Sequence, residues 1–135
     1  MESVIVVTDS SETLPLFEKL MRQHLPSAVS NRMTDPEEFT VESSSGQRIY
    51  FRKSDEVNAV GWDENELLII NHYFSSKPMV YTLSYREIDF VKWALSVLVD
   101  SSHYLIDNDC GTLLPGHEFV LKMRKNPNWY WFDDL

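Results

Sequence analysis

The chain has 135 residues, of which 43% are hydrophobic and 13% aromatic, and its 21 acidic and 12 basic residues give a net charge of −9. This length suits one compact domain with one core, no apolar run reaches the roughly 18 residues of a membrane span, and the start MESVIVVTDSSE lacks the basic region and cleavage site of a signal peptide. The acidity argues against nucleic acid or a membrane as direct partner, and a single cysteine excludes an internal disulfide, so we expect a cytoplasmic protein.

The first 53 residues predict a strand, a helix and a hairpin. Residues 4–8 are short and β-branched, which is typical of a buried strand. The Asp-Ser-Ser segment 9–11 can cap a helix, whose apolar residues recur at helical spacing until Pro26. Residues 27–38 are expected to form a loop or an irregular strand. Residues 39–53 alternate on both sides of a Ser-Ser-Gly turn, which indicates a hairpin.

The second half predicts further strands and two helices. ELLIINHYF, residues 66–74, and MVYTLSY, residues 79–85, are interpreted as strands that continue an antiparallel meander. Ser84 and Glu87 have the spacing of a capping box ahead of a helix with a broad apolar face. A short strand is expected at 103–106.

A last helix is expected to open at Pro115, with cations in its last turn. The resulting order is β-α-β-β-β-β-α-β-α. The fold class predicted is therefore α+β: a single domain, residues 1–135, with a mostly antiparallel sheet of about five to six strands packed against two to three helices.

Acidic residues end the predicted strand YLID and admit three interpretations. As a calcium loop, Asp107, Asp109 and Glu118 would fall on ligand positions, but Gly111 stands where the EF-hand pattern needs Asp or Asn. As a carboxylate pair, Asp107 and Asp109 would point to the same face of an extended chain and could bind a divalent ion. As a turn, Asp and Asn would end the strand and Gly111 would reverse it. The turn is the favoured interpretation.

The sequence shows no common catalytic or metal motif. The four histidines have neither HxxxH nor HxH spacing, and His72 is interpreted as a half-buried strand residue. Cys110 would need a base to act as a nucleophile, and His117 lies seven residues further along. P-loop, GxGxxG, GxSxG and HExxH patterns are lacking, so we expect no cofactor, no metal and no enzyme of these classes.

Two groups of aromatic residues are candidates for a partner-binding surface. The cluster 129–132, WYWF, could form such a surface or close over the core as a final strand, and we favour the core. Trp62 lies in an acidic stretch, 54–66, that contains no base, and it is the better interface candidate. Its alternative role is a loop anchor folded back on the sheet.

The C-terminal half resembles small immunity proteins of bacterial polymorphic-toxin and contact-dependent growth inhibition systems. Those proteins often carry a helix, a strand ending in an Asp-rich Gly turn and a "GEEF" helix, which here correspond to FVKWALSVLVDSS, HYLIDND and PGHEFVLKMR. The matching residues are Asp107, Asp109, Gly111, Gly116, Glu118 and Phe119. The resemblance implies a cytoplasmic protein that binds and blocks one cognate toxin domain, often a basic nuclease, and it implies structural roles for the matched residues.

The leading hypothesis is thus an immunity protein that occludes a basic toxin. Its predicted partner-binding residues are Asp55, Glu56, Trp62, Asp63, Glu64 and Glu66. One alternative is a small metal-dependent enzyme or metal-binding protein that uses Asp107, Asp109 and Glu118. Another is an acidic adaptor or inhibitor that mimics nucleic acid and binds a DNA-binding protein. The sequence demands no particular oligomeric state.

Overall fold

The structure, a computed structural model, describes residues 1–31, 37–54 and 61–134. Within these ranges the chain forms one seven-stranded sheet, antiparallel at every pairing, and four α-helices. The strands are β1 (Glu2–Thr8), β2 (Val29–Asn31), β3 (Glu38–Glu42), β4 (Arg48–Lys53), β5 (Met79–Tyr85), β6 (Leu105–Asp107) and β7 (Leu113–Pro115). The helices are α1 (Thr13–His24), α2 (Glu64–Tyr73), α3 (Ile88–Leu98) and α4 (Gly116–Lys125). The predicted α+β class is confirmed.

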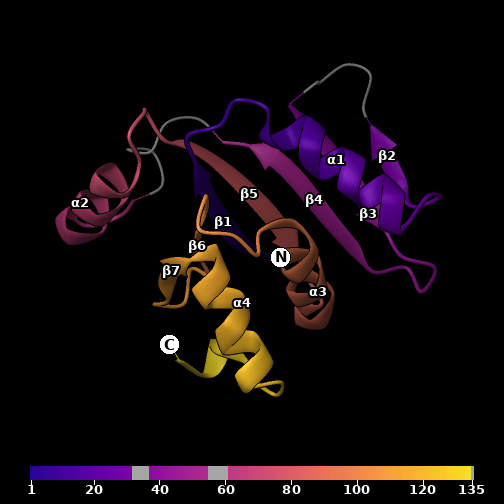
Figure 1. The fold of residues 1–135 in the computed structure, drawn as a ribbon. Coiled ribbons are helices and arrows are strands. Elements are labelled where there is room, and N and C mark those ends of the chain that lie inside the picture. The colour runs from indigo at the N-terminus through magenta and orange to yellow at the C-terminus, as the bar shows by residue number, and fades with distance from the viewer. Residues whose placement is uncertain (32–36, 55–60, 135) are drawn as a thin grey trace.

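The N-terminal strand lies inside the sheet. The strand order is β2-β3-β4-β5-β1-β6-β7, so β1 has β5 on one side and β6 on the other. The central residue Ile5 pairs with Thr82 of β5 on one side and with Asp107 of β6 on the other. The strands β2 to β5 form an antiparallel meander, and β5 is antiparallel to β1 (Figure 1).

One face of the sheet carries the main core. Alternate residues such as Val4, Val6 and Leu83 point to this face and are fully buried. The helices α1, α3 and α4 supply the opposing side chains, among them Phe17, Leu95 and Phe119. Three helices therefore cover this face.

The other face is covered less completely. Ile5, Val7, Val80 and Leu105 form a second, smaller apolar cluster there, and Ile70 of α2 packs on it. Figure 1 shows α2 on the far side of the sheet from α1, standing apart from the other helices. Consequently α2 is attached to the domain through one side of the helix.

The prediction of a strand at 66–74 is wrong, because the chain forms α2 there. Asp63 and Glu66 make a capping box: the Asp63 side chain accepts from the Glu66 backbone N–H, and the Glu66 side chain accepts from the Asp63 N–H. These bonds satisfy backbone donors that a helix start leaves open. The predicted meander places this strand between β4 and β5, but β4 pairs directly with β5 and leaves no room between them.

Two finer predictions about this region also fail. His72 is an exposed helix residue, and its Nδ1 lies 2.8 Å from the Leu68 carbonyl oxygen. Ser84 remains within β5 opposite Ser3, while α3 begins after Glu87 and has no side-chain cap. The sheet register holds Ser84 in the strand.

The C-terminal aromatic cluster closes the main core, as favoured, but as a 3₁₀-helix (Trp131–Asp134) rather than a strand. Trp131 is fully buried, and its indole N–H donates to the Tyr85 hydroxyl at 2.8 Å. Tyr130 remains half exposed. None of the helices in the described ranges is long and apolar enough to cross a membrane.

Candidate functional site

Four of the six predicted partner-binding residues lie together at the start of α2. Trp62 precedes the helix, Asp63 is its N-cap, and Glu64 and Glu66 lie in its first turn. Asp55 and Glu56 lie outside the described residues. The described part of the predicted surface is therefore one short segment with three carboxylates and one indole.

The three carboxylates differ in the hydrogen bonds that they make. Asp63 Oδ1 accepts from the Glu66 backbone N–H at 2.8 Å, and Glu66 Oε1 accepts from the Asp63 N–H at 3.2 Å. Glu64 is exposed and lies outside this pair. All three sit near the positive end of the helix dipole, which stabilises their charge. Each carboxylate retains lone pairs that a cationic partner could contact.

Trp62 takes the role of a loop anchor. Its ring is half-buried against the second apolar cluster, and its indole N–H donates to Asp107 Oδ2 at 2.6 Å. The polar end of the side chain is thus occupied within the chain. The indole fixes the segment ahead of α2 to the end of β6.

The acidic segment after β6 is a turn, as favoured. Asp107, only 6% exposed, accepts from the Asp109 backbone N–H at 2.8 Å. Asn108 accepts from the backbone N–H groups of Cys110 at 2.8 Å and Thr112 at 3.1 Å. Gly111 has a φ of +99°, which a side chain would disfavour, and β7 then pairs back onto β6.

The same turn disfavours a reactive thiol. Burial, followed by the charge of the nearby Asp109 carboxylate, raises the pKa of the Cys110 thiol above its ordinary value of 9.0. The thiol is therefore protonated at neutral pH. Since the thiolate is the nucleophilic form, the geometry does not favour covalent catalysis by this cysteine.

The described residues do not support a metal centre on the predicted carboxylates. Among them, no group of three or more His, Cys, Asp or Glu side chains could hold a metal ion. Asp107 is engaged with Trp62, Asp109 occupies a left-handed turn position with a φ of 60°, and Glu118 lies in the first turn of α4. The metal-dependent alternative thus finds no support in the described ranges.

The apolar surface of α2 was not predicted from the sequence. Leu68 is 55% exposed, Ile69 is 53% exposed and Tyr73 is 36% exposed, while Ile70 is the buried residue of the helix. The sequence feature that indicates this exposed apolar surface is the run Leu-Leu-Ile-Ile at 67–70. On a helix, four consecutive apolar residues surround the axis and cannot all face one sheet.

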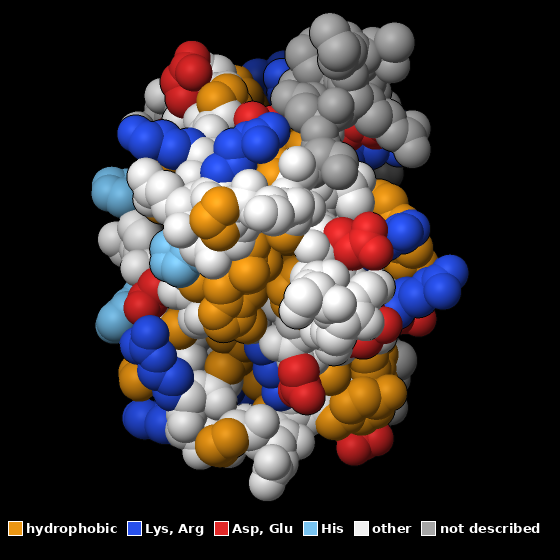
Figure 2. Space-filling view, turned by 90° about the vertical axis from the view of Figure 1, so that its right-hand side faces the viewer, with side chains coloured by type: hydrophobic (Ala, Val, Ile, Leu, Met, Phe, Trp, Pro, Cys, Tyr) orange, Lys and Arg blue, Asp and Glu red, His pale blue; other side chains and the backbone are white. Residues whose placement is uncertain are grey.

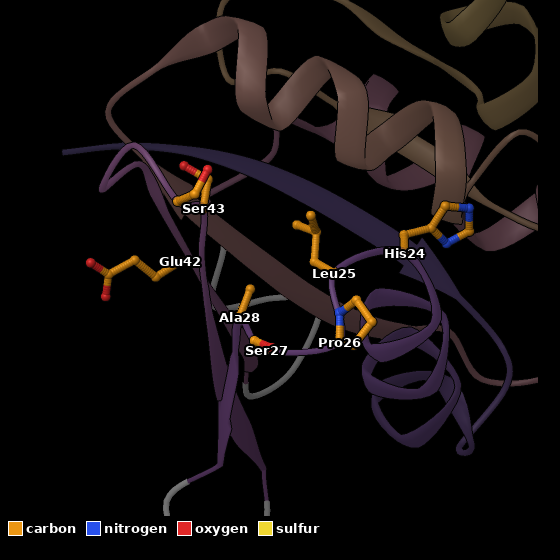
Figure 3. A pocket seen from close by; sticks show the side chains of 8 residues that line it. His24, Leu25, Pro26, Ser27, Ala28, Glu42 and Ser43 are labelled. Atoms are coloured by element: carbon orange, nitrogen blue, oxygen red, sulfur yellow. The ribbon is translucent and has the colours of Figure 1, made fainter.

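A separate groove lies near the end of α1. It has a volume of about 470 Å³ and is lined by residues 24–28 and 42–44. Figure 3 shows Leu25 and Pro26 on one wall and Glu42 and Ser43 on the other. None of the predicted partner-binding residues lines this groove.

Apolar side chains gather in the centre of the face drawn in Figure 2, with charged side chains around them.

No protein-family model, no curated protein and no solved structure matches this chain.

Proposed function

We propose that this chain is a cytoplasmic immunity-type protein that binds and neutralises one basic toxin domain. The observation that carries the proposal is the acidic start of α2, on a helix that stands apart from the other three. Such a helix end is accessible to a partner and carries the charge that a basic partner would recognise. The resemblance of the C-terminal half to immunity proteins supports the same class.

Charge complementarity supports a basic partner. The net charge is −9, and residues 1–66 hold 13 of the 21 acidic residues against 6 basic ones. Asp63, Glu64 and Glu66 concentrate negative charge at one helix end. Opposite fields accelerate association and reject partners of like charge.

The described part of this surface, residues 62–66, is also held in place before binding. The Asp63–Glu66 capping box sets the start of α2, and the Trp62–Asp107 hydrogen bond ties the preceding segment to the sheet. A surface that is ordered in the free protein loses less entropy on association. Preorganisation of this kind suits a tight inhibitor.

Co-expression with the product of the gene immediately upstream tests the proposal. The tagged chain should retain that protein stoichiometrically at low salt, relieve its toxicity, and release it as salt is raised. Recovery of a chromosomal DNA-binding protein instead would favour the nucleic-acid mimic. A clean monomer with no protection of the cells would contradict the proposal.

Charge reversal tests the surface itself. Glu56→Lys with Glu64→Lys should slow association by about tenfold at low salt, since both are predicted partner-binding residues and Glu64 is exposed outside the capping box. Glu12→Lys with Asp133→Lys makes the same change in net charge elsewhere and is the matched control. Equal slowing in both variants would show that net charge alone, and not this surface, governs association.

A further inference from the structure

The helix α2 has more apolar surface than the domain covers. Leu67, Leu68, Ile69 and Ile70 point in four directions around the helix axis, because successive residues are rotated by about 100°. Ile70 is fully buried and Leu67 is half-buried, whereas Leu68 and Ile69 are 55% and 53% exposed. Leu68 and Ile69 are therefore apolar surface of α2 that the sheet leaves uncovered.

On α1 and α4, by contrast, exposed large apolar side chains are isolated. Leu16 on α1 is 43% exposed and Leu121 on α4 is 40% exposed, each the single such residue of its helix. On α2, Leu68 and Ile69 are adjacent in the chain and each is more than half exposed. Gathered exposed apolar side chains mark interaction surfaces more often than scattered ones do.

We propose that the outer face of α2, formed by Leu68, Ile69 and the exposed His72 between them, is the apolar centre of the partner interface. This inference rests on the proposed function and adds the contact mode: the partner offers a basic rim around an apolar groove that receives α2. An apolar centre with a charged rim is the usual arrangement of protein interfaces.

Charge decides which occupant fits this face. Asp63, Glu64 and Glu66 lie within five residues of Leu68, and the segment 61–73 contains no Lys or Arg. A second copy of the chain would bring another net charge of −9 to the contact, and an anionic lipid surface would be repelled. A basic protein surface satisfies both the carboxylates and the apolar residues.

The test uses the full chain and a defined probe, a synthetic amphipathic helical peptide of leucine and lysine. Its analogue with glutamate in place of lysine is the charge control. Titration followed by amide NMR should shift the amides of residues 63–73, and the acidic analogue should not bind. Leu68→Gln and Ile69→Gln should each weaken binding about tenfold, since each removes roughly one buried aliphatic group.

Matched controls distinguish specific binding at this face from non-specific binding to exposed leucines. Leu16→Gln and Leu121→Gln remove similarly exposed leucines from other helices and should leave binding unchanged. Glutamine keeps a high helix propensity, so α2 should remain folded, as the amide spectrum would verify. Equal weakening in the controls, or shifts confined to the groove of Figure 3, would overturn the inference.

Other occupants would give distinct results. Dimerisation in sedimentation experiments that Leu68→Gln abolishes would assign the face to a second copy. Binding to phosphatidylcholine vesicles that the same variant abolishes would assign it to lipid. Neutralisation of the upstream protein that survives Leu68→Gln with Ile69→Gln would overturn this inference and leave the proposed function intact. Peptide binding on α2 without any neutralisation would overturn the proposed function alone.

Discussion

Trp62 and Asp107, 45 residues apart, are joined by a hydrogen bond of 2.6 Å from the indole N–H to the carboxylate. The bond connects the segment ahead of α2 with the turn that follows β6. Asp107 is 6% exposed and also accepts from the Asp109 backbone N–H, so two donors compensate for its burial. Asp107 thereby helps to position the start of α2.

Trp62→Phe should lower the free energy of unfolding by about 1–3 kcal/mol, because it deprives a buried carboxylate of a donor. Chemical denaturation measures the loss. Asp107→Asn and the double variant complete a cycle that isolates the coupling between the two side chains. Strict additivity would show that the bond contributes nothing beyond packing.

Asp109→Asn should stabilise the protein at neutral pH. Partial desolvation, then the charges of Asp107 and Glu2, raise the pKa of the exposed Asp109 carboxyl above its ordinary 3.8. The stabilising contribution of the protonated form is complete below pH 3.8 and is lost as the pH rises through the raised folded pKa. The advantage of asparagine should therefore be largest at neutral pH and vanish in acid, as urea melts across that range would show. An advantage that is constant with pH would mean that charge is not its cause.

Gly116→Ala should destabilise the fold by about 3 kcal/mol or more, or prevent folding. A Cβ at this position would lie 2.1 Å from the Val99 carbonyl oxygen and 2.6 Å from that of Ser101, and both are backbone atoms. Gly46→Ala is the control: its surroundings are open, and its φ of +84° should cost only about 1 kcal/mol. Thermal melts of the two variants should rank them clearly, and a similar loss in both would contradict the steric argument.

Trp131→Ala should cost about 3–5 kcal/mol, because it empties a fully buried site and removes the donor to Tyr85. Tyr130→Ala alters the neighbouring aromatic residue, which is half exposed, and should change stability by less than about 1 kcal/mol. Denaturant midpoints measure both. A comparable loss at Tyr130 would indicate that the exposed part of the cluster also bears on the core.

Much of the fold was predictable where a short pattern had one interpretation. The strand at 4–8, the helix ending near Pro26 and the hairpin at 39–53 follow from alternation, helical spacing and turn residues, and the structure contains all three. The run at 66–74 was predicted as a strand, and this prediction is wrong because a short apolar run suits a helix equally well. The pairing of β4 with β5 excludes a strand between them, and the Asp63–Glu66 capping box starts a helix instead.

The candidate site also combines features that the sequence predicts with features that only the tertiary structure shows. The sequence by itself determined the acidic charge near α2 and the Asp-Asn-Asp-Cys-Gly turn, because charge and turn chemistry depend on residues close together in the chain. Only the tertiary structure decided that Trp62 bonds to Asp107 and that Leu68 and Ile69 stay exposed. Those facts depend on which side of α2 the sheet can cover. A helix resting on one sheet face buries one side, whatever its sequence places on the other.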